Sequence, residues 1–278
     1  MTDGKVHRLL RIGLKVRALQ PAIDFYAQAL GFVLTPQTQV RTATLRLGDQ
    51  TLELVETTPE AEPYPRPRAA NDPWFQHFAI AVNDMDRAYA QLAPHLVKTG
   101  APGLGEAISH GAPVLLPPST GSVTAFKFRD PDGHPLELSL IPASDWMRAP
   151  VTEGPFLGID HTAVAIADLQ TSLQFWRDRL GLQLKAQLVN QGPEQARLDG
   201  LEAPVVDIAV LQFPAGGPHV ELLRYRSPTP PAPRSIDDGD IAATFVVLEA
   251  DGPTGETLQD PDGHRVRVVA PDGLDAKP

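Results

Sequence analysis

The sequence predicts an α+β fold built from four repeated modules, each of which begins with a strand. Two segments that begin at Leu19 and Leu169 match along their length and carry apolar residues at helical spacing. The motif Asp-Pro-Asp-Gly-His occurs at residues 130–134 and again at 260–264, each time before an alternating stretch that is typical of a β-strand. Together these repeats indicate a duplicated unit of strands and helix.

The first and third modules each contain one short amphipathic helix. In the first module Leu19, Ile23, Tyr26 and Leu30 recur at helical spacing, and Gly31 is placed to end the helix. The third module repeats this pattern 150 residues later. The modules that we expect span residues 8–57, 74–142 and 157–226, with a fourth at about 240–270.

The fourth module is too short for a comparable helix, because Gly252, Pro253 and Gly255 favour a turn where the helix would lie. Proline-rich segments at residues 59–73 and 227–233 separate the modules. We expect two halves of the chain. Residues 1–142 hold modules one and two, residues 143–157 form a linker, and residues 158–278 hold module three and the truncated module four.

Two histidines and two glutamates occupy matching places in modules two and three. His77 and His161 each begin an apolar strand, and each is followed 60 residues later by a glutamate with apolar neighbours, Glu137 and Glu221. Because successive strand side chains point to opposite faces, each carboxylate points away from the face on which its apolar neighbours pack. Both imidazoles share a face with alanines, which leaves space in front of them. The pattern favours one shared metal site.

Composition limits the classes of partner. The formal net charge is −10 and the pI is near 5.2, so neither nucleic acid nor an anionic membrane is an expected partner. The absence of cysteine excludes disulfides, thiolate nucleophiles and cysteine-type zinc sites. The first residues lack the apolar core of a signal peptide, and no apolar run is long enough to span a membrane. We expect a cytoplasmic protein that acts on a small-molecule substrate, and a homodimer is compatible with the sequence.

The order of strand, helix, glycine stop and three strands with a glutamate in the last resembles the vicinal oxygen chelate superfamily, and so does the Asp-Pro-Asp-Gly-His turn. This superfamily includes glyoxalase I, methylmalonyl-CoA epimerase, extradiol ring-cleaving dioxygenases and bleomycin-resistance proteins. The resemblance covers nearly all of residues 8–270. It implies a glyoxalase-like fold, in which paired βαβββ modules form curved mixed sheets around a metal. The first and the last strand of each module would supply one ligand each.

The resemblance implies a ligand set that depends on how the modules pair. If they pair in chain order, neither half of the chain offers a complete set. If module two pairs with module three, the two histidines and two glutamates meet, and they suit a divalent nickel, cobalt, zinc, manganese or iron ion. The implied positions in modules one to four hold Arg11 and Glu53, His77 and Glu137, His161 and Glu221, and approximately Ala243 and Arg267.

The function implied by the resemblance is that of a lyase or isomerase of glyoxalase type. It would act on a small substrate with adjacent oxygens through a metal-stabilised enolate, with either Glu137 or Glu221 as general base. Two alternatives stay open. An extradiol dioxygenase would use ferrous iron, His77, His161 and one glutamate, although such enzymes usually take their ligands from the second half alone. A metal-free binding or resistance protein is favoured, for one pocket, by the arginines at ligand positions.

Several other polar residues have a structural explanation. His134 and His264 occupy identical turn motifs, which predicts turn residues, and Arg11 with Glu53 predicts an ion pair. The loop at residues 101–121, which contains His110, either covers a cavity mouth or is a plain surface loop. The residues that either meet substrate or lie in solvent are Tyr225, Arg224, Arg226, Gln195 and Arg197.

Overall fold

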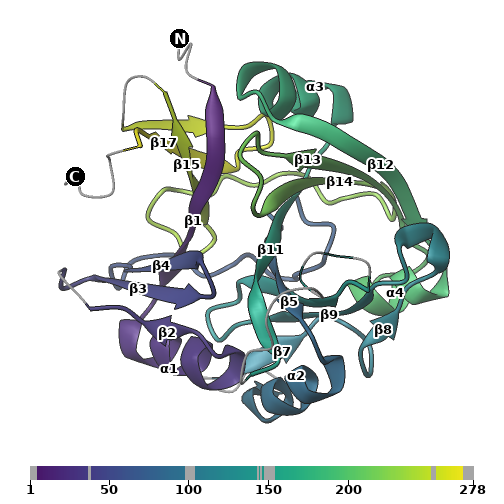
Figure 1. Ribbon diagram of the computed structural model, residues 1–278, viewed down its shortest axis with the longest axis horizontal. Coiled ribbons are helices and arrows are strands. Elements are labelled where there is room, and N and C mark those ends of the chain that lie inside the picture. Colours follow the sequence, from purple (N-terminus) through teal and green to yellow (C-terminus); the bar gives the residue numbers. More distant parts are fainter. Residues whose placement is uncertain are drawn as a thin grey trace.

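In the computed structural model the chain forms two curved mixed sheets, with the helices α1, α2 and α3 on their outer sides (Figure 1). The predicted α+β fold is confirmed, and each sheet is built from two modules. The structure describes residues 5–36, 39–97, 104–142, 144, 146, 154–251 and 255–271.

The first sheet joins module one to module four. Its seven strands lie in the order β16-β17-β15-β1-β4-β3-β2, and β1 runs antiparallel to β15 and parallel to β4. The described residues of module four form three strands and no helix, as the sequence predicts. The strands are β1 Val6–Val16, β2 Val33–Leu34, β3 Thr42–Leu47, β4 Gln50–Glu56, β15 Phe245–Ala250, β16 Glu256–Gln259 and β17 Arg265–Val269.

The second sheet joins module two to module three. Its path is β12-β13-β14-β11-β5-β10-β9-β7-β6, with β8 paired to β9 at the side. Here β5 runs antiparallel to β11, and each is parallel to the last strand of its own module. The strands are β5 Gln76–Val82, β6 Leu96–Val97, β7 Gly105–Ala107, β8 Val114–Leu115, β9 Thr124–Arg129, β10 Pro135–Leu140, β11 Phe156–Ala165, β12 Gln183–Gln191, β13 Val205–Gln212 and β14 His219–Ser227.

Modules therefore pair out of chain order, two with three and one with four. Each sheet takes strands from both sides of the expected linker at residues 143–157, most of which lies outside the described residues. The expected halves, residues 1–142 and 158–278, are continuous in the sequence, but each of them contributes strands to both sheets.

The helices of modules one and three form where the apolar spacing predicts them. Helix α1 spans Leu19–Leu30 and ends at Gly31, whose φ of 71° is in the left-handed region that glycine tolerates best. The matching helix of module three begins as α3 Leu169–Leu173 and continues as one π-helical segment, Gln174–Arg179. The other helices are α2 Met85–Leu92 and α4 Pro193–Asp199.

Equivalent hydrogen bonds anchor these helices to the Asp-Pro-Asp-Gly-His turns. The buried hydroxyl of Tyr26 in α1 donates to Asp130 at 2.8 Å, and the indole of Trp176 donates to Asp260 at 3.2 Å. Each contact connects the two sheets, because Tyr26 belongs to module one and Asp130 to module two. The turn motif therefore ends a hairpin and also orients the helix of another module.

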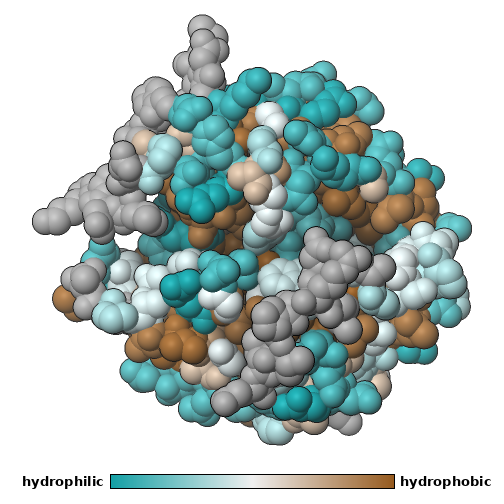
Figure 2. All heavy atoms as spheres, viewed as in Figure 1, coloured by the Kyte–Doolittle hydropathy of each residue, from teal (hydrophilic) through white to brown (hydrophobic). Residues whose placement is uncertain are grey.

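The face of the molecule that Figure 2 shows is mostly polar, with several apolar areas. The largest exposed fractions among apolar residues of strands are at β2, where Val33 is 67% exposed, and at β8, where Leu115 is 62% exposed. Within the described part of the chain, no helix combines the length and apolar character needed to cross a membrane.

The centre of the first sheet is filled by side chains. The strand register places Phe245 where module two has His77, which corrects the expectation of Ala243; Ala243 lies in the turn before β15. The short fourth module lacks the helix that would fix its alignment with the other modules. The sequence alignment therefore placed this position two residues too early in the chain. Arg267 stacks on the Phe245 ring at 3.6 Å, and Arg11 pairs with Glu53 at 2.6 Å, as predicted for an ion pair.

We expect Gly13→Ala to destabilise the protein by about 1–3 kcal/mol, as overpacking does. A Cβ at this position would lie 2.0 Å from the Phe245 ring. Urea unfolding measures the effect, and Phe245→Leu in the Gly13→Ala background should restore part of the loss. Gly239→Ala is the matched control, because a Cβ there meets nothing within 4 Å. Equal stability of Gly13→Ala and the wild type would contradict the filled centre.

Candidate metal centre

Four central strands of the second sheet bring the predicted ligand residues together. Glu137 of β10 pairs with Ala79 of β5, and Ala79 pairs in turn with His161 of β11. In the neighbouring row on the same face of the sheet, His77 of β5 pairs with Ala163 of β11, and Ala163 pairs with Glu221 of β14. His161 lies in the middle of β11, which begins at Phe156, so the expectation that it opens its strand was wrong.

The side chains of the two rows converge above the alanines. His77 Nε2 lies 3.5 Å from Glu137 Oε2, and His161 Nε2 lies 3.8 Å from Glu221 Oε2. The two imidazole rings have centroids 5.6 Å apart. Two imidazoles and two carboxylates therefore face one small volume, and each pair comes from one module.

Two further residues of the site were missed by the sequence analysis. His219 Nε2 lies 3.4 Å from Glu221 Oε1, and Asp160 Oδ2 lies 2.9 Å from His161 Nδ1. Sequence parity could have found His219, because it precedes Glu221 by two residues on the same strand face. Strand parity could not have found Asp160, because it places neighbours in a strand on opposite faces. The pairing of β11 with β5 is irregular between Ile159 and His161, and Asp160 therefore lies at the site together with His161.

Asp160, His161 and His219 also form a group whose ligand atoms all lie within 4.8 Å of one another. Asp160 is held from its other oxygen by the indole of Trp146, which donates at 2.6 Å. A carboxylate that binds Nδ1 fixes an imidazole ring and leaves Nε2 free to face the site. We therefore assign Asp160 the role of orienting His161.

Electrostatics separate the two central histidines. Burial lowers the pKa of His77 well below its usual value, and the charges of Lys127 and His161 lower it further. Neither ring nitrogen of His77 makes a hydrogen bond to any residue that the structure describes. Burial would also lower the pKa of His161, but the charge of Glu221 and the hydrogen bond and charge of Asp160 outweigh it and raise that pKa to about 9.

A buried lysine supports this acidic cluster. Lys127 Nζ lies 2.7 Å from Asp199 and 3.9 Å from Glu137. Asp199 also accepts hydrogen bonds from Gln195 at 2.7 Å and from Tyr225 at 3.1 Å. Two residues whose role the sequence left open, Gln195 and Tyr225, thus lie in the second layer of the site.

The centre opens into a cavity of about 410 Å³. Leu116 and Thr120, which belong to the loop at residues 101–121, line this cavity. That part of the loop therefore lies beside the cavity, in agreement with one of the two expectations for it. Much of the remaining wall is apolar, with Leu188, Val206 and Ile208 among its residues. The cavity combines a polar floor with apolar walls, as ligand sites commonly do.

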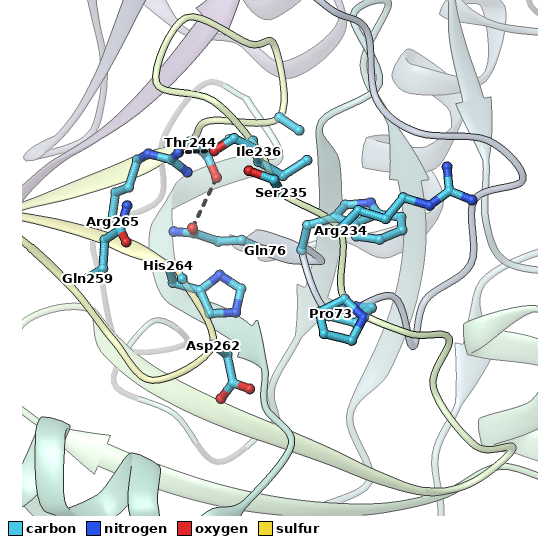
Figure 3. Close-up of a pocket in the computed structure, with 14 residues that line it drawn as sticks. Pro73, Gln76, Arg234, Ser235, Ile236, Thr244, Gln259, Asp262, His264 and Arg265 are labelled. Atoms are coloured by element: carbon cyan, nitrogen blue, oxygen red, sulfur yellow. Dashed lines mark hydrogen bonds between the residues drawn. The ribbon is translucent and has the colours of Figure 1, made fainter.

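Figure 3 shows a smaller cavity, of about 260 Å³, where β5 meets the start of β15. Several of its polar side chains are hydrogen-bonded: the side-chain oxygen of Gln76 accepts from the hydroxyl of Thr244 at 3.0 Å, and His264 donates from Nε2 to the backbone carbonyl of Ala165 at 2.7 Å. His264 is thus a buried turn residue with a structural role.

The remaining candidates lie outside the metal centre. His134 is buried in its turn against Asp130 at 2.8 Å. Arg224 and Arg226 both pair with Asp207 on β13. Arg197 is exposed on α4.

We expect Lys127→Met to lower the free energy of unfolding by about 3–5 kcal/mol, because it leaves Asp199 as an unpaired buried charge. The measurement is urea unfolding in the presence of a chelator. Tyr225→Phe is the milder control, since it removes one hydrogen bond to Asp199 and should cost about 1 kcal/mol. Adding Asp199→Asn to Lys127→Met should recover part of the loss. Two single variants of equal stability would contradict the ion pair.

Comparison with known proteins agrees with this architecture. The solved structure of glyoxalase I from Zea mays superposes with a TM-score of 0.63 at 20% sequence identity, over 95% of this chain and 92% of that chain. A dioxygenase-like protein from Bacillus subtilis subsp. subtilis str. 168 gives a TM-score of 0.54 at 12% identity, over 96% and 86% of the two chains. These likenesses concern the fold.

No curated protein matches the chain in sequence. The family described as the Glyoxalase/Bleomycin resistance protein/Dioxygenase superfamily matches residues 8–138 and 158–273, which is most of the chain. Because the match covers most of the chain, the chain belongs to the glyoxalase/bleomycin resistance protein/dioxygenase superfamily.

Proposed function

We propose that the protein is a divalent-metal-dependent enzyme of glyoxalase type, a lyase or isomerase that acts on a small substrate with adjacent oxygens. The observation that carries the proposal is His77. Burial keeps the pKa of its imidazole well below the usual value, the residue is 2% exposed, and neither ring nitrogen is hydrogen-bonded to a described residue, although a carboxylate lies 3.5 Å away. A buried nitrogen with a free electron pair beside an acid is what a metal ligand requires.

The donor set also fits the ion. His77, His161, Glu137 and Glu221 would hold it, with two nitrogen and two oxygen donors that suit nickel, cobalt, zinc, manganese or ferrous iron. When bound, the ion would act as a Lewis acid that stabilises negative charge on a substrate oxygen. The substrate would enter over the apolar walls of the 410 Å³ cavity.

Within that cavity the chain's own residues would orient substrate and move a proton. Glu137 accepts a hydrogen bond from Ser139 at 2.5 Å, and Glu221 faces His219 at 3.4 Å. Either carboxylate can take a proton from a carbon next to a substrate carbonyl and return it to the neighbouring carbon. The two glutamates are equal candidates for this role.

The apolar walls favour a compact, largely apolar substrate. Lys127 is the one cationic lysine or arginine among the described residues that line the cavity, and Asp199 already neutralises it. A substrate arm with several carboxylates would find no free cation there.

We expect untagged wild-type protein to contain one divalent ion per chain, and His77→Ala and His161→Ala each to lose it. Inductively coupled plasma mass spectrometry measures the content. His110→Ala, an exposed histidine outside the cavity, is the control. An ion that persists in His77→Ala but leaves in His219→Ala would place it in the Asp160 group instead, and wild-type protein without any ion after reloading would sink the proposal.

Replacing the glutamates tests the proton transfer. Glu137→Gln or Glu221→Gln should lower kcat by about 10²–10⁴-fold for whichever glutamate moves the proton, since general base catalysis contributes that much. The assay is isomerisation of hemithioacetals of small α-oxoaldehydes with apolar thiols. Ring cleavage of catechol by the iron-loaded protein, with no turnover of hemithioacetals, would instead show the extradiol dioxygenase.

A further inference from the structure

A third cavity, of about 340 Å³, lies between β7, the end of β9, the segment at residues 66–70 and the end of α4. None of the residues that line it lines the metal cavity. Its walls carry three arginines, Arg66, Arg68 and Arg129. The chain as a whole has a net charge of −10, so this concentration of positive charge is local.

Arg129 is the notable member of this group. It is the last residue of β9 and is 5% exposed. Its guanidinium makes no hydrogen bond and no ion pair with any residue in the described part of the chain. Burial, and to a smaller extent the charge of Arg68, lower its pKa to about 10 against the opposing charges of Glu106 and Asp72. A buried cation without a partner is costly, so its retention calls for an anion.

The nearby carboxylates are already engaged. Glu106 binds Arg68 at 2.7 Å, and Asp199 binds Lys127 at 2.7 Å. Asp72 accepts a hydrogen bond from the backbone of Ala69 at 2.7 Å and makes no ion pair with Arg129, although its charge and that of Glu106 favour the charged guanidinium. Arg129 and Arg66 are therefore the arginines of this cavity that have no ion-pair partner among the described residues.

We propose that this cavity binds a small organic monoanion, a carboxylate with an apolar body, through Arg129. A guanidinium presents two parallel N–H groups to a carboxylate and forms the stronger kind of charge-assisted hydrogen bond. Arg129 is buried and Arg66 is exposed, so one buried guanidinium with apolar wall beside it suits a single carboxylate on an apolar body better than a fully polar phosphate. Ala70 and Ile108, both buried, supply apolar wall for the rest of the ligand.

The site is independent of the proposed metal chemistry, so chelator-treated protein can be used to test it. Isothermal titration calorimetry in chloride-free buffer compares benzoate, acetate and inorganic phosphate. We expect benzoate to bind, acetate to bind more weakly because it lacks the apolar body, and phosphate to bind least. No heat with benzoate up to about 10 mM would overturn the proposal, because affinities weaker than that carry little free energy.

Two variants locate the binding. Arg129→Gln removes the cation, and Ala107→Glu, at an exposed position on the cavity wall, supplies a carboxylate from the chain itself. Each should weaken benzoate binding at least tenfold, whereas Arg46→Gln, a distant surface arginine, should leave it unchanged. If Arg129→Gln does not fold, the affinity of Ala107→Glu for benzoate tests the proposal by itself. Unchanged affinity in Ala107→Glu, or tighter binding of phosphate than of benzoate, would overturn the proposal.

Discussion

The antiparallel pairing of β5 with β11 is the constraint on which the candidate metal centre depends. It sets Ala79 opposite His161 and Ala163 opposite His77, so each histidine faces an alanine across the strand pair. A shift of one residue would turn one imidazole to the face that packs against the helices. The small alanine side chains leave the space into which both imidazoles and both glutamates lean. No single module contains the complete set.

The same framework has a different outcome in the first sheet. There the position of His77 is taken by Phe245, and the facing alanine position by Gly13, which is the residue small enough to accept the ring. Arg267 and Arg11 replace acidic and imidazole donors, and their charges are balanced by the aromatic ring and by Glu53. This sheet is complete with its own side chains. The second sheet retains unpaired donor atoms, which is the physical difference between a filled centre and one that can take a ligand.

Much of this could be predicted from the sequence, and the exceptions have physical causes. Duplication and strand parity identified His77, Glu137, His161 and Glu221, because both depend on local spacing. Asp160 was missed because the pairing of β11 is irregular beside it, and parity arguments assume a regular strand. The partner of Lys127, Asp199, was also out of reach, since it lies 72 positions away in the sequence. The incorrect assignment of Ala243 arose in module four, which lacks the helix by which the sequences of the modules are aligned.

The out-of-order pairing has a consequence for how the chain folds during synthesis. Arg8 of β1 binds Glu249 of β15, 241 positions further along the chain, so module one cannot complete its sheet until nearly the whole protein has been made. Until then β1 presents an unpaired strand edge, which is the kind of surface that associates with other chains. Contacts this distant also slow folding, because a long loop must close before they form. Strand β15 therefore covers the edge of the first strand, and a chain that ended before Phe245 would expose that edge.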